Sequence, residues 1–299
     1  MPYTDALILA GGIGKRLYPI STPEHPKQFL QGPNGKTFFE SALDRAFALA
    51  ENIFVICGKL HTPHIEKILA GLPDKKQQVR VITEPVGRNT ALPIALAASL
   101  SNREGHSEDR TMLVLTSDHV IQPLERFVDD ALSLEAAVRQ KGLGVFGIKP
   151  TRPDTNYGYI ETVDTPKAGD SATGSRVKAV KAFREKPCKE DAEAYLAAGN
   201  FYWNSGMFAF NTGYIIEEFK QNCPEITIPA SLEGEALQLF YEDPGIPATS
   251  FDYAITEKCQ DVHMVESSFN WNDIGSIEEY TRIINHEYNI INLSLSSWV

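Results

Sequence analysis

Short apolar runs that alternate with amphipathic stretches constrain the fold of this chain most, and they fill its first half. Short runs between polar residues favour strands, whereas apolar residues three and four apart favour helices. The expected strands are Ala6–Ala10, Ile53–Cys57, Val79–Thr83, Met112–Leu115 and Leu143–Ile148. The expected helices are Thr37–Ala50, Pro63–Ala70, Thr90–Ser99 and Leu124–Gln140. This alternation predicts an α/β fold with a mixed, mostly parallel sheet flanked by helices.

The alternation breaks down after about residue 150. Strands are expected there at Tyr157–Thr162, Val177–Phe183 and Met207–Asn211, and helices at Glu190–Ala198, Gly213–Lys220 and Leu232–Phe240. We interpret this half as a β-rich insertion that forms the second wall of a ligand cleft. Residues 1–285 are expected to form one domain, followed by a short tail at 286–299.

The charge balance favours a small-molecule ligand. The 299 residues carry a formal net charge of −11, whereas a nucleic-acid surface would need a basic stripe. The four cysteines lie far apart, with no disulfide framework or metal-ligand spacing, which is typical of a reducing compartment. No signal peptide precedes Gly11, and no apolar run is long enough to span a membrane. We therefore expect a cytoplasmic protein that binds neither nucleic acid nor membrane.

A glycine-rich segment, Leu9-Ala10-Gly11-Gly12-Ile13-Gly14-Lys15-Arg16-Leu17, follows the first expected strand. Glycines let a backbone approach phosphate oxygens closely, and Lys15, Arg16 and Lys27 could add charge-assisted contacts. The P-loop pattern fails because Arg16 follows Lys15, and the dinucleotide pattern fails at Leu17. A tight turn without a ligand is the alternative, and the basic side chains argue against it. The segment therefore predicts a nucleotide-phosphate loop of another type.

Two acidic residues are candidates for a metal site. Asp118 closes the expected strand at Met112–Leu115, and Asp273 lies in a polar loop between Trp271 and Gly275. Mg²⁺ prefers oxygen ligands and takes one or two carboxylates together with substrate phosphates. An ordinary aspartate turn explains either residue alone equally well. His119 is expected to be a hydrogen-bonding neighbour rather than a ligand, because Mg²⁺ prefers oxygen.

Further polar segments suit a nucleoside and a sugar. A helix N-cap explains Asn89 and Thr90 without any ligand, but it does not explain Gly87 and Arg88, which suit a base edge or a phosphate. Glutamate and asparagine side chains beside glycines can read sugar hydroxyls, and a lysine can pair with a sugar phosphate. Such residues lie in Asn156–Tyr159, Phe183–Pro187 and Tyr202–Met207, where each segment also has a plain structural explanation.

Taken in order, these motifs resemble the sugar-1-phosphate nucleotidyltransferases and, within them, the mannose-1-phosphate guanylyltransferases. The resemblance runs from residue 6 to about residue 285. Besides the glycine loop and Ser117-Asp118-His119, it covers Pro26–Phe29, Glu84–Thr90, Asn156–Ile160, Phe183–Pro187, Trp203–Phe208, Phe251–Lys258 and Trp271–Gly275. It implies a Rossmann-like fold of the nucleotide-diphospho-sugar transferase type, with the β-rich insertion on the sugar side of the cleft.

The resemblance also implies a reaction and residue roles. GTP and α-D-mannose 1-phosphate would give GDP-mannose, for polysaccharide biosynthesis, and pyrophosphate, with Mg²⁺ as cofactor. Arg16 and Lys27 would be catalytic, and Asp118 and Asp273 would bind the metal. The nucleotide-binding residues would be Leu9, Ala10, Gly11, Gly12, Gly14, Lys15, Glu84, Pro85, Gly87, Arg88, Asn89, Thr90 and Ser117. The residues at the sugar phosphate would be Tyr157, Gly158, Glu185, Lys186 and Asn204.

Two alternatives stay open. The first keeps the chemistry but uses another sugar 1-phosphate or nucleoside triphosphate, because Pro93 and Thr116 depart from the family pattern. The second is a regulatory paralogue that binds nucleotide sugars without turnover, although the catalytic and metal positions are all occupied by the expected residue types. Longer members of the family carry an isomerase module, which is not expected in a chain that stops at Val299. The oligomeric state is open, with a homodimer as the candidate.

Overall fold

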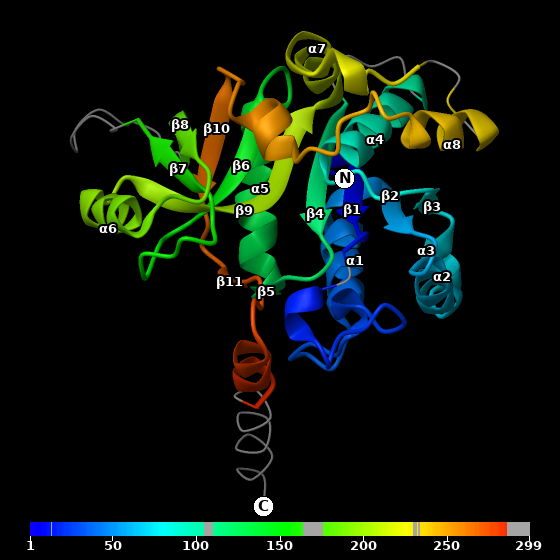
Figure 1. The fold of residues 1–299 in the computed structure, drawn as a ribbon, viewed down its shortest axis with the longest axis horizontal. Coiled ribbons are helices and arrows are strands. Elements are labelled where there is room, and N and C mark those ends of the chain that lie inside the picture. Colours follow the sequence, from blue (N-terminus) through cyan, green and yellow to red (C-terminus); the bar gives the residue numbers. More distant parts are fainter. Residues whose placement is uncertain (13, 105–109, 164–175, 230–231, 233, 286–299) are drawn as a thin grey trace, which may run out of the picture.

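The structure, a computed structural model, describes residues 1–12, 14–104, 110–163, 176–229, 232 and 234–285. In these ranges nine strands form one mixed sheet in the order β3-β2-β1-β4-β9-β6-β10-β8-β7 (Figure 1). One half contains β1 (Tyr3–Leu9), β2 (Ala50–Gly58), β3 (Val79–Glu84) and β4 (Thr111–Thr116). These four strands pair in parallel, which confirms the α/β fold expected from the alternation.

The other half of the sheet is paired mainly antiparallel. It contains β6 (Leu143–Ile148), β7 (Tyr159–Thr162), β8 (Val177–Arg184), β9 (Phe201–Asn211) and β10 (Val262–Glu266). β9 lies between β4 and β6 and runs antiparallel to both, while β10 pairs with β6 in parallel. The β-rich half therefore continues the main sheet instead of forming a sheet of its own.

Helices cover both faces of the sheet. On one face a shared apolar cluster includes residues of α1 (Phe38–Leu49), α2 (Thr62–Ala70), α5 (Leu124–Val138) and α6 (Lys189–Ala198). The opposite cluster includes residues of α4 (Ala91–Glu104), α7 (Thr212–Asn222) and α8 (Gly234–Glu242). Because side chains alternate along a strand, β1 contributes Ile8 to the first cluster and Leu7 to the second.

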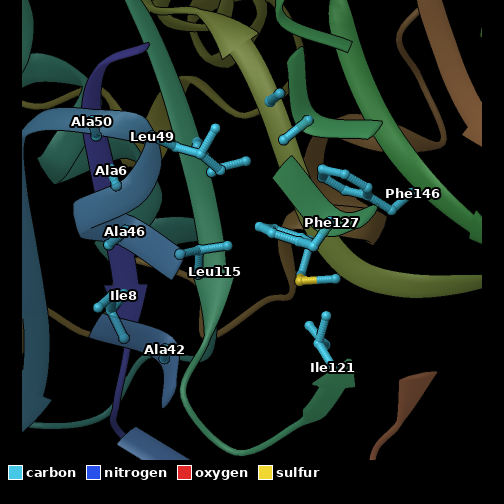
Figure 2. Close-up of a cluster of buried hydrophobic side chains, with 14 of the residues drawn as sticks. Ala6, Ile8, Ala42, Ala46, Leu49, Ala50, Leu115, Ile121, Phe127 and Phe146 are labelled. Atoms are coloured by element: carbon cyan, nitrogen blue, oxygen red, sulfur yellow. The ribbon is translucent and has the colours of Figure 1, made fainter. Parts of the chain in front are cut away.

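Figure 2 shows the first cluster at the packing of α1 on β1, where Ala42 and Ala46 of the helix lie close to Ile8 of the strand. Small alanine side chains allow the helix to approach the sheet closely. Deeper in the same cluster, Phe127 of α5 and Phe146 of β6 stack with ring centroids 5.4 Å apart. All five side chains are buried, so this face of the sheet is held by apolar contact.

The strand order places the ends of β1 and β4 together. From β1 the chain builds outward through β2 to β3, and then it returns to the other side of β1 for β4. The connections that follow β1 and β4 therefore run in opposite directions along the sheet. This is a topological switch point, where open α/β sheets bind ligands. The glycine loop leaves β1 and Asp118 leaves β4 at this edge.

The strand and helix boundaries differ from the expectation in the second half. β9 begins at Phe201, so that the expected strand at Met207–Asn211 is only its second part. Residues Asn270–Asn272, expected in a loop, form β11, which pairs with β5 (Val120–Gln122) in a separate two-stranded sheet. The sequence does not predict β5 or β11, because three residues are too few to show an apolar pattern and the two strands are far apart in sequence. β10 was missed as well.

The remaining elements are short. They are α3 (Pro73–Lys76), the 3₁₀ turns η1 (Lys15–Leu17), η2 (Lys27–Phe29) and η3 (Pro224–Ile226), and a π-helical turn, η4 (Asp252–Thr256). Residues 277–285 form a further helix, and the tail expected at 286–299 lies outside the described residues. Among the helices in the described ranges, none has both the length and the apolar character needed to cross a bilayer.

Candidate active site

The carboxyl edge of β1, β3 and β4 opens into a cavity of about 630 Å³. Several expected site residues line it together: Leu9, Gly11, Gly12, Arg16, Glu84, Gly87, Asn89, Thr90, Asp118 and Lys186. The wall also contains residues to which the sequence assigned no binding role, namely Ile56, Pro93, Thr116, His119, Gly206, Phe208 and Asp252. Pro93 and Thr116 are the two positions that depart from the family pattern, so the departure lies in the cavity wall.

Lys27 joins the two candidate metal ligands. Its side chain is only 4% exposed, and its Nζ lies 2.9 Å from Asp118 Oδ2. The same Nζ donates to the backbone carbonyl of Asp273. A buried ammonium needs such partners, because an unpaired charge is costly to desolvate. The structure thus brings Asp118, which follows β4, and Asp273, which follows β11, to one point.

Gly14 seats Lys27. Gly14 adopts φ 73°, in the left-handed region, and a Cβ there would lie 2.4 Å from Lys27 Cβ. Ser21 Oγ donates to the Gly14 carbonyl at 2.6 Å and closes the turn. The sequence attributes this glycine to phosphate approach, whereas the described contact of Gly14 is with the lysine itself.

Tyr157 contacts Asp273 rather than standing free for a sugar phosphate. Its Oη donates to Asp273 Oδ1 at 2.7 Å, and its ring packs between Trp203 and Trp271 with centroids 5.1 and 5.3 Å away. Burial, and then Asp273, raises the pKa of Tyr157, so the phenol stays a donor. On the other oxygen, Arg16 Nη2 lies 3.5 Å from Asp273 Oδ2. Both carboxylate oxygens are thereby oriented.

The electrostatics keep Asp118 ionised. Burial opposes its charge, but Lys27, together with His119 and Arg16, outweighs burial and holds the pKa of Asp118 below its ordinary value. Neighbouring His119 accepts a hydrogen bond from Trp271 Nε1 at its Nδ1, 3.1 Å away. Burial lowers the pKa of His119 to about 4, so the imidazole is neutral and its proton lies on Nε2. His119 is therefore the hydrogen-bonding neighbour that the sequence predicts.

These residues fit a hard divalent cation. Asp118 and Asp273 supply oxygen donors only, which is the ligand type that Mg²⁺ prefers. In the part of the chain that the structure describes, no group of three His, Cys, Asp or Glu side chains could hold a metal alone. The protein would therefore supply two carboxylates, and substrate phosphates and water would supply the other ligands.

Glu84 lines the cavity at the end of β3. It is 7% exposed, and the buried phenol of Tyr241 lies against its carboxylate. Burial raises the pKa of Glu84 to about 7, although Tyr241 acts as a hydrogen-bond donor that lowers it. The Oε2 atom lies beside Gly11, 3.4 Å from where a Cβ on that glycine would be. A carboxylate can accept more hydrogen bonds than the single one that Tyr241 offers, so the oxygen beside Gly11 can still accept from a ligand.

The start of α4 is held by a tertiary contact besides its expected N-cap residue. The Ala91 N–H donates to the carbonyl of Thr249 at 3.2 Å, and Thr90 Oγ1 accepts from the Phe251 N–H at 2.8 Å. Asn89 has φ 63° and accepts from the Thr90 N–H at 2.9 Å. Thr90 occupies the expected N-cap position, because α4 begins at Ala91 and the Thr90 carbonyl accepts from the Ile94 N–H at 3.3 Å. Its hydroxyl, however, ties residues 89–91 to the segment that begins η4.

Arg88 is not brought into the cavity wall. Its guanidinium donates to three backbone carbonyls, those of Tyr241 at 2.8 Å, Asp243 at 3.0 Å and Ile246 at 2.9 Å. This use of the donors differs from the base or phosphate contact that the sequence suggests. Arg88 holds the end of α8 and the following turn against the loop that carries Glu84 and Gly87.

Asp252 is a further acidic residue of the cavity wall. Asn204 Nδ2 donates to its Oδ1 at 2.6 Å, and Asn204 Oδ1 accepts from the Gly206 N–H at 3.1 Å. Burial raises the pKa of Asp252 to about 6. The sequence included Asp252 in a family motif without giving it a role. Its position in the π-helical turn η4, a form frequent at functional sites, was not readable from the sequence.

Glu185 and Lys186 form an ion pair with one another, and Lys186 also lines the cavity. A Cβ on Gly158 would lie 2.6 Å from Glu185 Oε2, so the glycine makes room for the carboxylate. Of the other expected residues, Lys15 is exposed, Ser117 is buried and Pro85 is half-buried. Ala10 is buried, and its carbonyl accepts from Gln28 Nε2 at 3.1 Å, so it serves the fold.

Comparison with known proteins agrees with this geometry. A sequence model of the nucleotidyl transferase family matches residues 5–289. The alginate biosynthesis protein AlgA of Pseudomonas syringae is 36% identical over 279 residues, which are 90% of this chain and 56% of AlgA. The mannose-1-phosphate guanylyltransferase ManC of Salmonella typhimurium is 36% identical over 289 residues, 94% of this chain and 59% of ManC. The chain thus spans little more than half the length of these relatives.

A solved structure is also similar. The crystal structure described as a mannose-1-phosphate geranyltransferase from Thermus thermophilus matches with a TM-score of 0.75 and 32% identity. The match covers 91% of this chain and 76% of that one.

Gly14→Ala tests the seating of Lys27. The new Cβ would meet Lys27 Cβ at 2.4 Å in a left-handed backbone, so we expect the free energy of unfolding to fall by about 2 kcal/mol. Urea denaturation measures this. Gly12→Ala is the matched control, because a Cβ on Gly12 meets nothing within 4 Å. Equal stability of the two variants would contradict the proposed packing.

Tyr157→Phe tests the orientation of Asp273. The change removes only the hydroxyl that donates to Asp273 Oδ1, and the loss of such a partner lowers metal affinity about 10-fold. Mn²⁺ binding, followed by electron paramagnetic resonance, reports the change. Tyr195→Phe is the control, because it removes the hydroxyl of a tyrosine on α6 whose ring stacks on Phe201, with centroids 4.2 Å apart, and not on the candidate metal ligands. An unchanged Mn²⁺ affinity in Tyr157→Phe would show that the hydroxyl does not position the carboxylate.

Proposed function

The chain belongs to the nucleotidyl transferase family, and we propose that it transfers a guanylyl group from GTP to α-D-mannose 1-phosphate. The products are GDP-mannose and pyrophosphate. One observation carries this proposal: Lys27 joins Asp118 and Asp273 at a cavity whose wall contains Asp118, Glu84 and Asp252. The names of the ManC and AlgA relatives support the substrate pair. A cytoplasmic location, a homodimer and a catalytic domain at residues 1–285 are parts of the proposal.

In the proposed reaction an oxygen of the sugar phosphate attacks the α-phosphorus of GTP in line. The bond from that phosphorus to the bridging oxygen breaks, and pyrophosphate leaves with the electron pair. Catalysis is then mainly positioning and charge neutralisation. Arg16 is 64% exposed in its side chain, so it is free to turn to the triphosphate. Lys27 holds the two aspartates in register, and a divalent cation bound by them, Mg²⁺ in this proposal, would neutralise phosphate charge.

Guanine suits the acceptor that Glu84 offers. The N1–H and the N2 amino group of guanine present two adjacent donors, and a carboxylate accepts both. Adenine presents an acceptor at N1, which would face the carboxylate oxygens unfavourably. Because Glu84 is buried and the phenol of Tyr241 is its donor among the described residues, a base that fails to donate leaves the second carboxylate oxygen unsatisfied, and such a site discriminates between bases.

The sugar end offers donors and acceptors suited to hydroxyl groups. Asp252 and Asn204 form one hydrogen-bonded unit, and Glu185 lies near enough to raise the pKa of Asp252 after burial has done so. Their oxygens can accept from sugar hydroxyls, while Lys186 supplies a cation for the sugar phosphate. The order along the cleft is then nucleoside, phosphates with metal, sugar phosphate and hexose.

Pyrophosphate release tests the proposal directly. The purified chain is assayed with Mg²⁺ against four nucleoside triphosphates and a panel of sugar 1-phosphates, with Asp118→Asn as the background control. Turnover should be highest with GTP and mannose 1-phosphate. Highest turnover with another pair of nucleoside triphosphate and sugar 1-phosphate would support nucleotidyl transfer but contradict GTP and mannose 1-phosphate as the substrates. Nucleotide-dependent thermal stabilisation without turnover would favour a binding protein instead.

Glu84→Gln tests base selection. An amide offers one acceptor where guanine needs two, so kcat/KM with GTP should fall at least about 10-fold and the ratio of GTP to ATP use should narrow. Asp252→Asn is the control at the other end of the cleft, and it should leave the GTP-to-ATP ratio unchanged. An unchanged ratio in Glu84→Gln would move base recognition elsewhere.

The same residue predicts a pH dependence. Burial raises the pKa of Glu84 to about 7 in the free protein, and guanine donors bind the ionised form. The affinity for GTP should therefore weaken as the pH falls through 7, because the carboxyl group takes up a proton that must be released for binding. The titration of the triphosphate itself is common to wild type and Glu84→Gln. Identical pH profiles of binding in the two proteins would contradict the assignment.

A further inference from the structure

Arg45 is an anomaly outside the cleft described above. It lies on α1, is 2% exposed and is among the largest fully buried side chains. Its Nε and Nη2 have no hydrogen-bond partner in the described ranges. Buried guanidinium groups are normally paired, because an unpaired buried charge loses its hydration without compensation. A group of this kind points to a ligand that completes it.

The side chain faces a cavity of about 360 Å³ between the start of α1 and the turn from β5 to α5. Asn34 and Ser41 line one side, and Gln122 lines the other, so a hydroxyl and two amides accompany the guanidinium. The one acidic side chain in this wall, Asp44, already pairs with Lys36 at 2.5 Å. The wall is thus mixed, with Ile121, Pro123 and Leu124 as its apolar part. Asp44 and then Asp118 favour the charge of Arg45, but neither forms an ion pair with it among the described residues.

This arrangement suits a tetrahedral oxyanion. A guanidinium donates to two oxygens of a phosphoryl group at once, and the amide of Gln122 can donate to a third. Asn34 Nδ2 donates to Ser41 Oγ at 3.2 Å, so those two side chains border the site as a bonded pair. We propose that the Arg45 cavity is a second binding site, which takes the phosphoryl group of inorganic phosphate or of a phosphorylated sugar. The burial of Arg45 lowers its pKa only to about 10, so the side chain stays charged at neutral pH.

The site lies behind the catalytic carboxylates. A void of about 20 Å³ is lined by both Arg45 and His119, and His119 adjoins Asp118. Arg45 and Asp118 also act on one another electrostatically, since Asp118 favours the charged guanidinium. A bound anion would offset the field of Arg45 at Asp118, so occupancy of this site is coupled to the active site through charge.

Thermal unfolding of the full chain with added inorganic phosphate tests the site at constant ionic strength. A ligand that binds only the folded state raises Tm, and a hexose 6-phosphate in a parallel arm distinguishes the two sources of the phosphoryl group. The measurement is repeated in Arg16→Ala/Lys186→Ala, which lacks the exposed cations of the catalytic cleft. We expect the phosphate-dependent rise of several degrees to persist in that variant and to be lost in Arg45→Met.

Arg45→Met should also unfold at the same or a higher temperature than wild type without phosphate, because an unpartnered charge is replaced by an apolar chain of similar length. Gln122→Leu on the opposite wall should weaken the phosphate response if Arg45→Met cannot be purified. Absence of any response in wild type would overturn the proposal. So would a response that survives in Arg45→Met or that vanishes in Arg16→Ala/Lys186→Ala.

Discussion

The contact on which the site depends is the buried ammonium of Lys27, shared between Asp118 and the backbone of Asp273. It joins three segments that are remote in sequence: the turn after the glycine loop, the end of β4 and the end of β11. The two acidic segments would repel one another if they were brought together without it. Lys27 is itself admitted by Gly14, where no larger residue fits. Local backbone freedom at one glycine therefore supports a tertiary assembly of charges.

The sheet topology explains why one cleft has two chemically different ends. The parallel half presents Glu84, the glycine loop and Asp118 at the carboxyl edges of its strands, where ligands of open α/β sheets bind. The antiparallel half contributes Asn204 from β9, and the π-helical turn adds Asp252. The hydrogen bond from the Phe251 N–H to Thr90 Oγ1 links the segment before this turn directly to the start of α4. A shift of one end is thus transmitted to the other through a single turn of chain.

Much of the parallel half could be predicted from the sequence, because each strand is a separate apolar run and each helix has its own spacing. Leu143–Ile148 has the expected bounds, and the acidic residues at strand ends were recognisable by position. β5 and β11 could not be found, since each is three residues long and is stabilised by the other. The same reason hid the bonds of Arg88 and Tyr157, whose partners lie more than a hundred positions away. Residue type shows what a side chain can bond, but not which distant group it meets.

The three hydrogen bonds of Arg88 bear on how this cleft could be redesigned. Residues 84–90 carry the wall that we propose faces the base, and Arg88 among them donates to carbonyls of residues 241–246. A backbone carbonyl is present whatever side chain occupies residues 241–246, so substitutions there keep the acceptors. A substitution of Arg88 removes all three donors. For a graft between homologues, the two segments form one transferable module. A loop exchanged without its partner would retain its chemistry and lose its support.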